Sequence, residues 1–162
     1  MTKKKDKSIQ PITTKKSFPG LVARGVSFLK ENDSTSKDTA AIEKNPGDAD
    51  YYNNRGDAKK KLGDYTGAIK DYTKAIELEP GNVHAYNWRG LAKYDLKDYT
   101  GAIKDYTKAI ELDPEDVYAY YYRGLAKKIL GSKQEALEDF STAGELGYMD
   151  AYKRIHELQS DK

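Results

Sequence analysis

Few residues of this 162-residue chain could take part in catalysis. Cysteine is absent, and the two histidines, His84 and His156, lie far apart in the sequence with no nucleophile or further metal ligand beside them. No glycine-rich loop of the kind that binds phosphate occurs. The sequence therefore predicts a protein that is not an enzyme and that holds no metal and no cofactor.

Charged residues instead recur at a fixed spacing. Three times an arginine is followed 16 residues later by an aspartate, and the pairs are Arg55 with Asp71, Arg89 with Asp105 and Arg123 with Asp139. If the two positions lie on facing antiparallel helices, the guanidinium and the carboxylate can approach and form a bidentate pair. We interpret the pairs as a ladder that ties the helices together. The alternative is that the arginines bind carboxylates of a partner.

The recurring pairs belong to an internal repeat of 34 residues. Residues 49–82 and 83–116 are identical at 23 of 34 positions, and the run Asp64–Leu78 returns unchanged as Asp98–Leu112. A third copy, residues 117–150, keeps the framework but diverges in its second half. Terminal repeats often diverge in this way.

Each copy is predicted to form two helices, over residues 50–62 and 66–78 in the first copy. Apolar residues recur at the spacing of one helical stripe in the second of these segments. Gly63 is expected to end the first helix, and Pro80 to end the second. Gly56 and Ala68 are small residues that allow the two helices to approach closely, so bulky replacements there should be disruptive.

This pattern resembles the tetratricopeptide repeat, and bacterial members of that family in particular. The resemblance covers residues 49–150 and rests on the period and on these positions: Gly56, Gly90 and Gly124; Ala68, Ala102 and Ala136; Ala75, Ala109 and Ala143; Tyr72, Tyr106 and Phe140; Pro80 and Pro114. It implies an all-α, right-handed superhelical solenoid of three repeats, with the first helix of each repeat lining a concave groove for a peptide of a partner protein. Tyr52, Arg55 and Lys59, with their counterparts, depart from the family pattern, so no specific partner transfers.

The rest of the chain is predicted to divide into three parts. Residues 1–16 read as a basic, disordered tail, residues 17–45 could hold a degenerate half repeat, and residues 46–162 form the repeat domain. A capping helix is predicted over residues 150–159. In that helix Ala151, Tyr152, Ile155 and Leu158 are expected to cover Leu137, Phe140 and Ala143.

The predicted ligand-contacting residues lie on the first helices, face away from the second helices and differ between copies. They are Asn53, Asn54, Asp57, His84, Asn87, Trp88, Leu91, Tyr94, Tyr118, Tyr121, Tyr122 and Leu125. We expect apolar or aromatic side chains of a peptide to dock around the tryptophan and the tyrosines, and the asparagines to bind its backbone. The alternative is that the aromatic residues pack between repeats, which applies most to Tyr121. The resemblance also implies that Trp88, Tyr118 and Tyr122 replace the residues with which some relatives hold a chaperone's C-terminal carboxylate, so that ligand is not expected.

The favoured function is thus a protein–protein interaction module. The alternatives are a self-associating scaffold, and binding of nucleic acid or an anionic surface through the lysine-rich tail. No DNA partner is expected, because the formal charge of the whole chain is only +2 and residues 46–162 are mildly acidic. No segment approaches the roughly 18 apolar residues that span a bilayer, and no secretory signal is evident, so a soluble, cytoplasmic protein is predicted.

Overall fold

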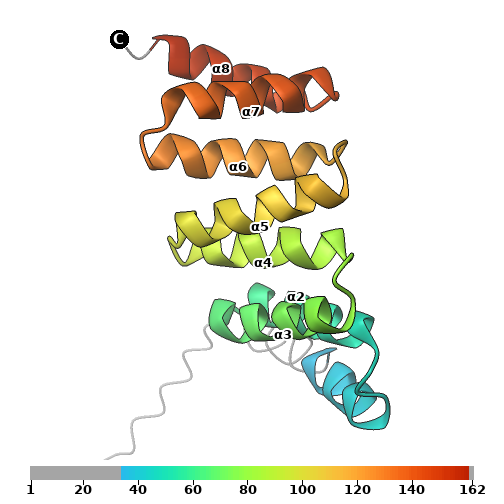
Figure 1. Cartoon of the computed structure of the whole chain (residues 1–162). Helices are drawn as coiled ribbons and strands as arrows, with labels where there is room; N and C mark the ends of the chain where they lie inside the picture. Colours follow the sequence, from blue (N-terminus) through green and yellow to red (C-terminus); the bar gives the residue numbers. More distant parts are fainter. Residues whose placement is uncertain (1–33, 161–162) are drawn as a thin grey trace, which may run out of the picture.

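The computed structural model describes residues 34–160, and within that range it contains only helices (Figure 1). Residues 34–44 form a first helix. It is followed by α2 (Ala49–Lys61), α3 (Tyr65–Leu78), α4 (Val83–Asp95), α5 (Tyr99–Leu112), α6 (Val117–Ile129), α7 (Lys133–Glu145) and α8 (Asp150–Ser160). The predicted basic tail, and the part of the half repeat before residue 34, lie outside the described residues.

Acidic or amide side chains start most of these helices. Asp64 accepts a hydrogen bond from the backbone N–H of Gly67 at 2.8 Å, and Asn82 accepts one from Ala85 at 3.0 Å. These side chains satisfy N–H groups that have no partner inside the helix. The first helices end at a residue with positive φ, which is Gly63 in the first repeat, Gly131 in the third, and Lys97 in the second.

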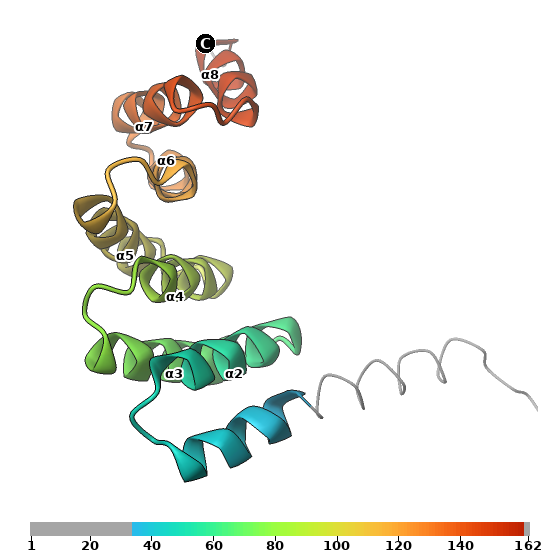
Figure 2. The same ribbon diagram turned by 90° about the vertical axis from the view of Figure 1, so that its right-hand side faces the viewer.

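The helices stack in chain order to form a solenoid, as the two views show (Figures 1 and 2). Each helix packs mainly against the helices before and after it, and α4 additionally contacts α2 and α6. The first helices of the repeats therefore share one face of the solenoid. The prediction of an all-α helical repeat solenoid is confirmed.

The core of each repeat is a large aromatic side chain packed on a glycine. Tyr72, Tyr106 and Phe140 are the largest fully buried side chains in the described part of the chain. A Cβ atom added to Gly56 would lie 2.7 Å from Cε1 of Tyr72, and one added to Gly90 would lie 2.8 Å from Cε1 of Tyr106. Glycine is thus required because the aromatic ring occupies the space of a side chain.

The structure brings the members of each Arg–Asp pair together. Arg89 donates from Nε to Asp105 at 3.0 Å and from Nη2 at 2.7 Å, while the Asp105 residue is only 4% exposed. Lys93 also reaches Asp105, at 2.7 Å. Arg89 further donates to the hydroxyl of Thr73 on α3, at 3.1 Å. The pair is thus part of a network that links one repeat to the preceding one, and the same network recurs at Arg55 and Arg123.

Residues 34–44 make the contacts of a second helix. Arg55 donates to the hydroxyl of Thr39 at 3.4 Å, as Arg89 does to Thr73. Ile42 packs against the buried cluster that contains Tyr52. These contacts extend the solenoid toward the N-terminus, whereas a half repeat over the whole of residues 17–45 stays a prediction.

Helix α8 covers the end of the array. Ala151 and Leu158 are buried, and Ile155 packs against the same cluster as Phe140. Tyr152 is 41% exposed, yet its ring lies where a side chain on Gly144 would be, since a Cβ added there would lie 2.8 Å from Cζ of Tyr152. The glycine that interrupts the apolar stripe of the third repeat thus makes room for the aromatic ring of α8.

Candidate functional site

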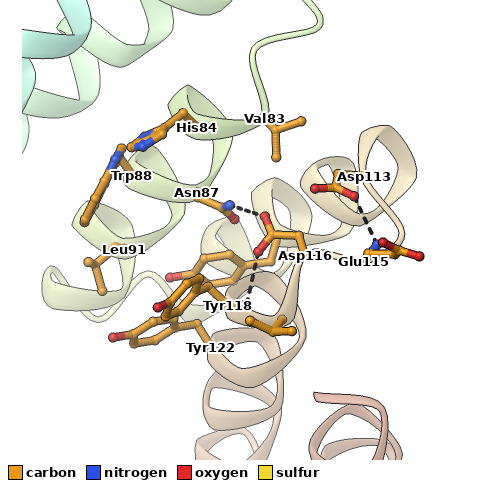
Figure 3. Close-up of a pocket in the computed structure, with 12 residues that line it drawn as sticks. Val83, His84, Asn87, Trp88, Leu91, Asp113, Glu115, Asp116, Tyr118 and Tyr122 are labelled. Carbon is orange, nitrogen blue, oxygen red and sulfur yellow. Dashed lines mark hydrogen bonds between the residues drawn. The ribbon is translucent and has the colours of Figure 1, made fainter. Parts of the chain in front are cut away.

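A groove of about 800 Å³ opens on the face shared by the first helices. Its lining comes from α4, from Tyr106 of α5, from the connection between α5 and α6, and from α6 (Figure 3). The lining residues are Val83, His84, Asn87, Trp88, Leu91, Tyr106, Asp113, Glu115, Asp116, Val117, Tyr118 and Tyr122. The groove therefore lies between the second and third repeats.

One wall of the groove is aromatic and apolar. Trp88 lies beside His84, with 5.5 Å between the ring centroids, and Leu91 follows on the next turn of α4. The Nζ atom of Lys60 lies 4.0 Å from the centroid of the Trp88 ring, an arrangement that stabilises a cation. Burial lowers the pKa of Lys60, although the carboxylate of Asp57 acts in the opposite direction. Trp88 also packs against the buried cluster of Ala68, Tyr72 and Ala92, and it lines the groove.

The opposite side of the groove is acidic (Figure 3). Asp113 and Glu115 are exposed there, and Asp116 caps α6 by accepting hydrogen bonds from the backbone N–H groups of Tyr118 and Ala119. The side-chain amide of Asn87 donates to the other carboxylate oxygen of Asp116. This bond joins the two repeats across the floor of the groove.

Three buried polar atoms of the groove have no hydrogen-bond partner among the described residues. They are Oδ1 of Asn87, Nε1 of Trp88 and the hydroxyl of Tyr106. Buried polar groups are normally paired, and an unpaired one costs free energy. These two donors and one acceptor belong to side chains that line the groove.

Six of the twelve predicted residues line the groove. They are His84, Asn87, Trp88, Leu91, Tyr118 and Tyr122. The groove is not lined by Asn53, Asn54, Asp57, Tyr94, Tyr121 or Leu125. It is thus confined to the second and third repeats, although the prediction extended it to the first.

Tyr121, which was predicted to contact a ligand, packs inside the fold, as the alternative interpretation states. It is 7% exposed, its ring lies 4.7 Å from that of Tyr148, and its hydroxyl accepts a hydrogen bond from Arg154 of α8. Tyr148 replaces the proline of the other repeats and provides this packing partner, so the Tyr121 side chain points toward the core. Leu125 packs against the same cluster.

The side chains of two further predicted residues contact other side chains of the fold. Asp57 accepts a hydrogen bond from the Tyr72 hydroxyl at 2.6 Å. Tyr94 packs edge-on against Tyr99, with 5.2 Å between the centroids. Neither side chain is available to the groove in the way the sequence analysis expected.

The second helix and the connecting loop also contribute to the groove, although the prediction placed its lining on the first helices alone. Tyr106 lies on α5, and Asp113 and Glu115 lie between α5 and α6. A comparison of copies could have found Tyr106, because Asp57 in the first repeat is replaced by Leu91 in the second while the tyrosine remains.

The described residues contain no group of histidine, cysteine, aspartate and glutamate side chains that could hold a metal ion. Among the same residues, no helix is both long and apolar enough to cross a membrane.

Models of the tetratricopeptide repeat family match residues 53–117 and residues 105–138. No curated protein sequence matches the chain. Among solved structures, the Arabidopsis OM64 TPR domain is 32% identical, with a TM-score of 0.64, and the match covers 67% of this chain and 94% of that domain.

Two other structures resemble this chain. The second TPR domain of human RPAP3, solved in complex with the HSP70 peptide SGPTIEEVD, is 32% identical with a TM-score of 0.65, and the match covers 68% of this chain and 93% of that domain. MamA is 20% identical with a TM-score of 0.76 over 83% of this chain and 80% of that protein, and it supports the fold alone. The 34-residue period and the glycine–aromatic packing agree with these matches. The chain therefore belongs to the tetratricopeptide repeat family.

Proposed function

We propose that this protein is a non-catalytic interaction module that binds an extended peptide segment of a partner protein in the groove between α4 and α6. The observation that carries the proposal is the lining of the groove, where Trp88, Tyr118 and Tyr122 lie together with unpaired polar atoms. Tryptophan and tyrosine are the residue types enriched at binding hot spots. The peptide complex of the RPAP3 domain supports a ligand of this class.

A peptide backbone suits the polar groups of the groove. Its carbonyl groups can accept hydrogen bonds from Tyr106 and Trp88, and its N–H groups can donate to Asn87. An apolar or aromatic side chain of the peptide would lie against Leu91 and Tyr122. A purely apolar ligand would leave all three polar atoms unpaired.

The acidic side of the groove favours a basic residue in the ligand. Asp113, Glu115 and Asp116 together bring three carboxylates to this side. The HSP70 peptide in the RPAP3 complex carries acidic residues at its end, which these carboxylates would repel. We therefore expect the bound peptide to combine an apolar or aromatic residue with a neighbouring lysine or arginine, since such charges improve specificity and speed association.

The proposal is tested with peptides selected on the full chain from a random-sequence phage library. The strongest binder is synthesised with blocked ends, and its affinity is measured by calorimetry for the wild type and for Trp88→Ala. We expect Trp88→Ala to weaken binding by about 2 kcal/mol or more, roughly 30-fold. Its free energy of unfolding should fall by much less than the about 3–5 kcal/mol of a truncated core tryptophan.

Asn54→Ala is the matched control, because Asn54 occupies the same place in the first repeat and does not line the groove. It should leave the affinity unchanged. Equal affinities of the wild type and Trp88→Ala would contradict the proposal, and so would selected peptides that are rich in aspartate and glutamate.

A further inference from the structure

One pair of facing positions is occupied by different residues in the three repeats. In the first repeat Asp57 accepts a hydrogen bond from Tyr72, and in the third the corresponding residues are Leu125 and Phe140, neither of which has a polar side chain. Neither of these pairs leaves a polar side-chain group without a hydrogen-bond partner. The second repeat combines the leucine of one with the tyrosine of the other.

That combination leaves the Tyr106 hydroxyl without an internal acceptor. Tyr106 is 1% exposed, and its hydroxyl has no hydrogen-bond partner among the residues that the structure describes. Its ring is fixed by close packing on Gly90 and by stacking with Tyr122, at 6.1 Å between centroids. The hydroxyl therefore cannot easily rotate away toward solvent.

The same side chain lines the groove, together with Leu91 and Tyr122. Burial raises the pKa of Tyr106 well above its usual range, so the hydroxyl keeps its proton at physiological pH and can donate a hydrogen bond. A ligand in the groove can supply the acceptor that the fold lacks, because Tyr106 and Leu91, which stands in place of the aspartate, both line the groove.

Resting on the proposed function, we infer that the Tyr106 hydroxyl donates a hydrogen bond to a backbone carbonyl oxygen of the bound peptide. A carbonyl fits this place better than a carboxylate, because the three acidic side chains of the groove disfavour a further anion there. The hydrogen bond from the Tyr106 hydroxyl would fix the position of the peptide along the groove, and this donor belongs to the second repeat. The first repeat has no free hydroxyl at this place, and the third has none at all.

Tyr106→Phe tests the inference with little risk to the fold, since it reproduces the Leu–Phe pair that the third repeat already contains. The variant should be as stable as the wild type or more stable, because a buried unpaired hydroxyl is removed. Its affinity for the library-selected peptide should fall roughly three- to tenfold, as expected for one hydrogen bond. Tyr72→Phe is the matched control, and it should lower stability without weakening binding, because its hydroxyl serves Asp57.

Leu91→Asp gives a second test. It recreates the Asp–Tyr pair of the first repeat, so the hydroxyl of Tyr106 should then be occupied inside the fold. In this background, adding Tyr106→Phe should lower stability and should no longer reduce affinity. A third test replaces the amides of the peptide one at a time by esters, because an ester carbonyl is a weaker hydrogen-bond acceptor. At one position the ester should reduce the affinity for the wild type but not the affinity for Tyr106→Phe.

The outcomes separate the inference from the proposed function. Unchanged affinity of Tyr106→Phe, with binding still lost in Trp88→Ala, would overturn the hydrogen bond and leave the groove in place. A loss of stability in Tyr106→Phe equal to that in Tyr72→Phe would also overturn it, because the hydroxyl would then have an internal partner. A library that yields no peptide dependent on Trp88 would contradict both.

Discussion

At the scale of single residues, each repeat contains a carboxylate that lies between an arginine and a lysine. Asp105 accepts from Arg89 at 2.7 Å and lies 2.7 Å from Nζ of Lys93. Arg89 in turn lies over the ring of Tyr86, at 5.5 Å from its centroid. The tyrosine, arginine and lysine that depart from the family pattern thus belong to one network.

This arrangement predicts unequal effects of removing its members. Arg89→Ala leaves Asp105 paired with Lys93 and should cost about 1–2 kcal/mol of unfolding free energy, whereas Asp105→Ala leaves two cations without their carboxylate and should cost about 3 kcal/mol. Urea denaturation measures both. Lys108→Ala, which removes an exposed pair with Glu111, is the control and should leave the free energy of unfolding nearly unchanged. Equal, small effects of all three variants would show that the network does not stabilise the fold.

At the scale of helices, the turns after the first helices follow one geometry with different residues. Gly63 and Gly131 have φ values of +81° and +84°, and Lys97 has a φ value of +64° at the equivalent position. A residue with a Cβ atom is disfavoured in this conformation. The second repeat therefore carries a local strain that the other two avoid.

Lys97→Gly should relieve this strain. We expect the free energy of unfolding to rise by about 0.5–1 kcal/mol, since the removal of the Cβ clash outweighs the greater freedom of glycine in the unfolded chain. The reverse change, Gly63→Lys, is the matched control and should destabilise by a similar amount. Thermal or urea unfolding that ranks Lys97→Gly below the wild type would argue against this explanation.

The final helix gives a second prediction at this scale. Truncation after Gly147 removes Ala151, Leu158 and the ring of Tyr152, so it exposes the cluster around Phe140. Burial of a side chain of the size of Leu158 contributes roughly 1.5–3 kcal/mol, so the melting temperature and the solubility should both fall. Lys153→Ala changes an exposed residue of the same helix and should have no such effect. An unchanged melting temperature after truncation would mean that α8 does not act as a cap.

The helices were predictable because their signals are local and repeated. The period, the turn glycines and the apolar stripes lie within one repeat, and the helix ends differ from the prediction by about one residue. The groove was predicted only in part, since the burial of Tyr121 depends on Tyr148 and Arg154, which lie in later elements. The replacement of Asp57 by Leu91 is visible in the sequence, whereas the pairing of Asp57 with Tyr72, which gives that replacement its meaning, is seen only in the structure.

At the scale of the whole molecule, stacking creates a site that no single repeat contains. The groove takes its aromatic wall from the second repeat and its acidic side from the connection to the third, and the bond between Asn87 and Asp116 holds the two together. The ladder of arginines, aspartates and threonines fixes the angle between neighbouring repeats along the array. The shape of the groove thus depends on contacts that lie outside it.

The central claim is that a peptide binds against Trp88, and this residue is the only tryptophan of the chain. Its fluorescence therefore reports on the groove without any label. In a titration with a library-selected peptide that lacks tryptophan, we predict that the emission of Trp88 shifts to the blue and that acrylamide quenches it less. Both changes should saturate with the dissociation constant that calorimetry gives for the same peptide. Calorimetric binding that saturates while the emission and the quenching of Trp88 stay unchanged would contradict the claim.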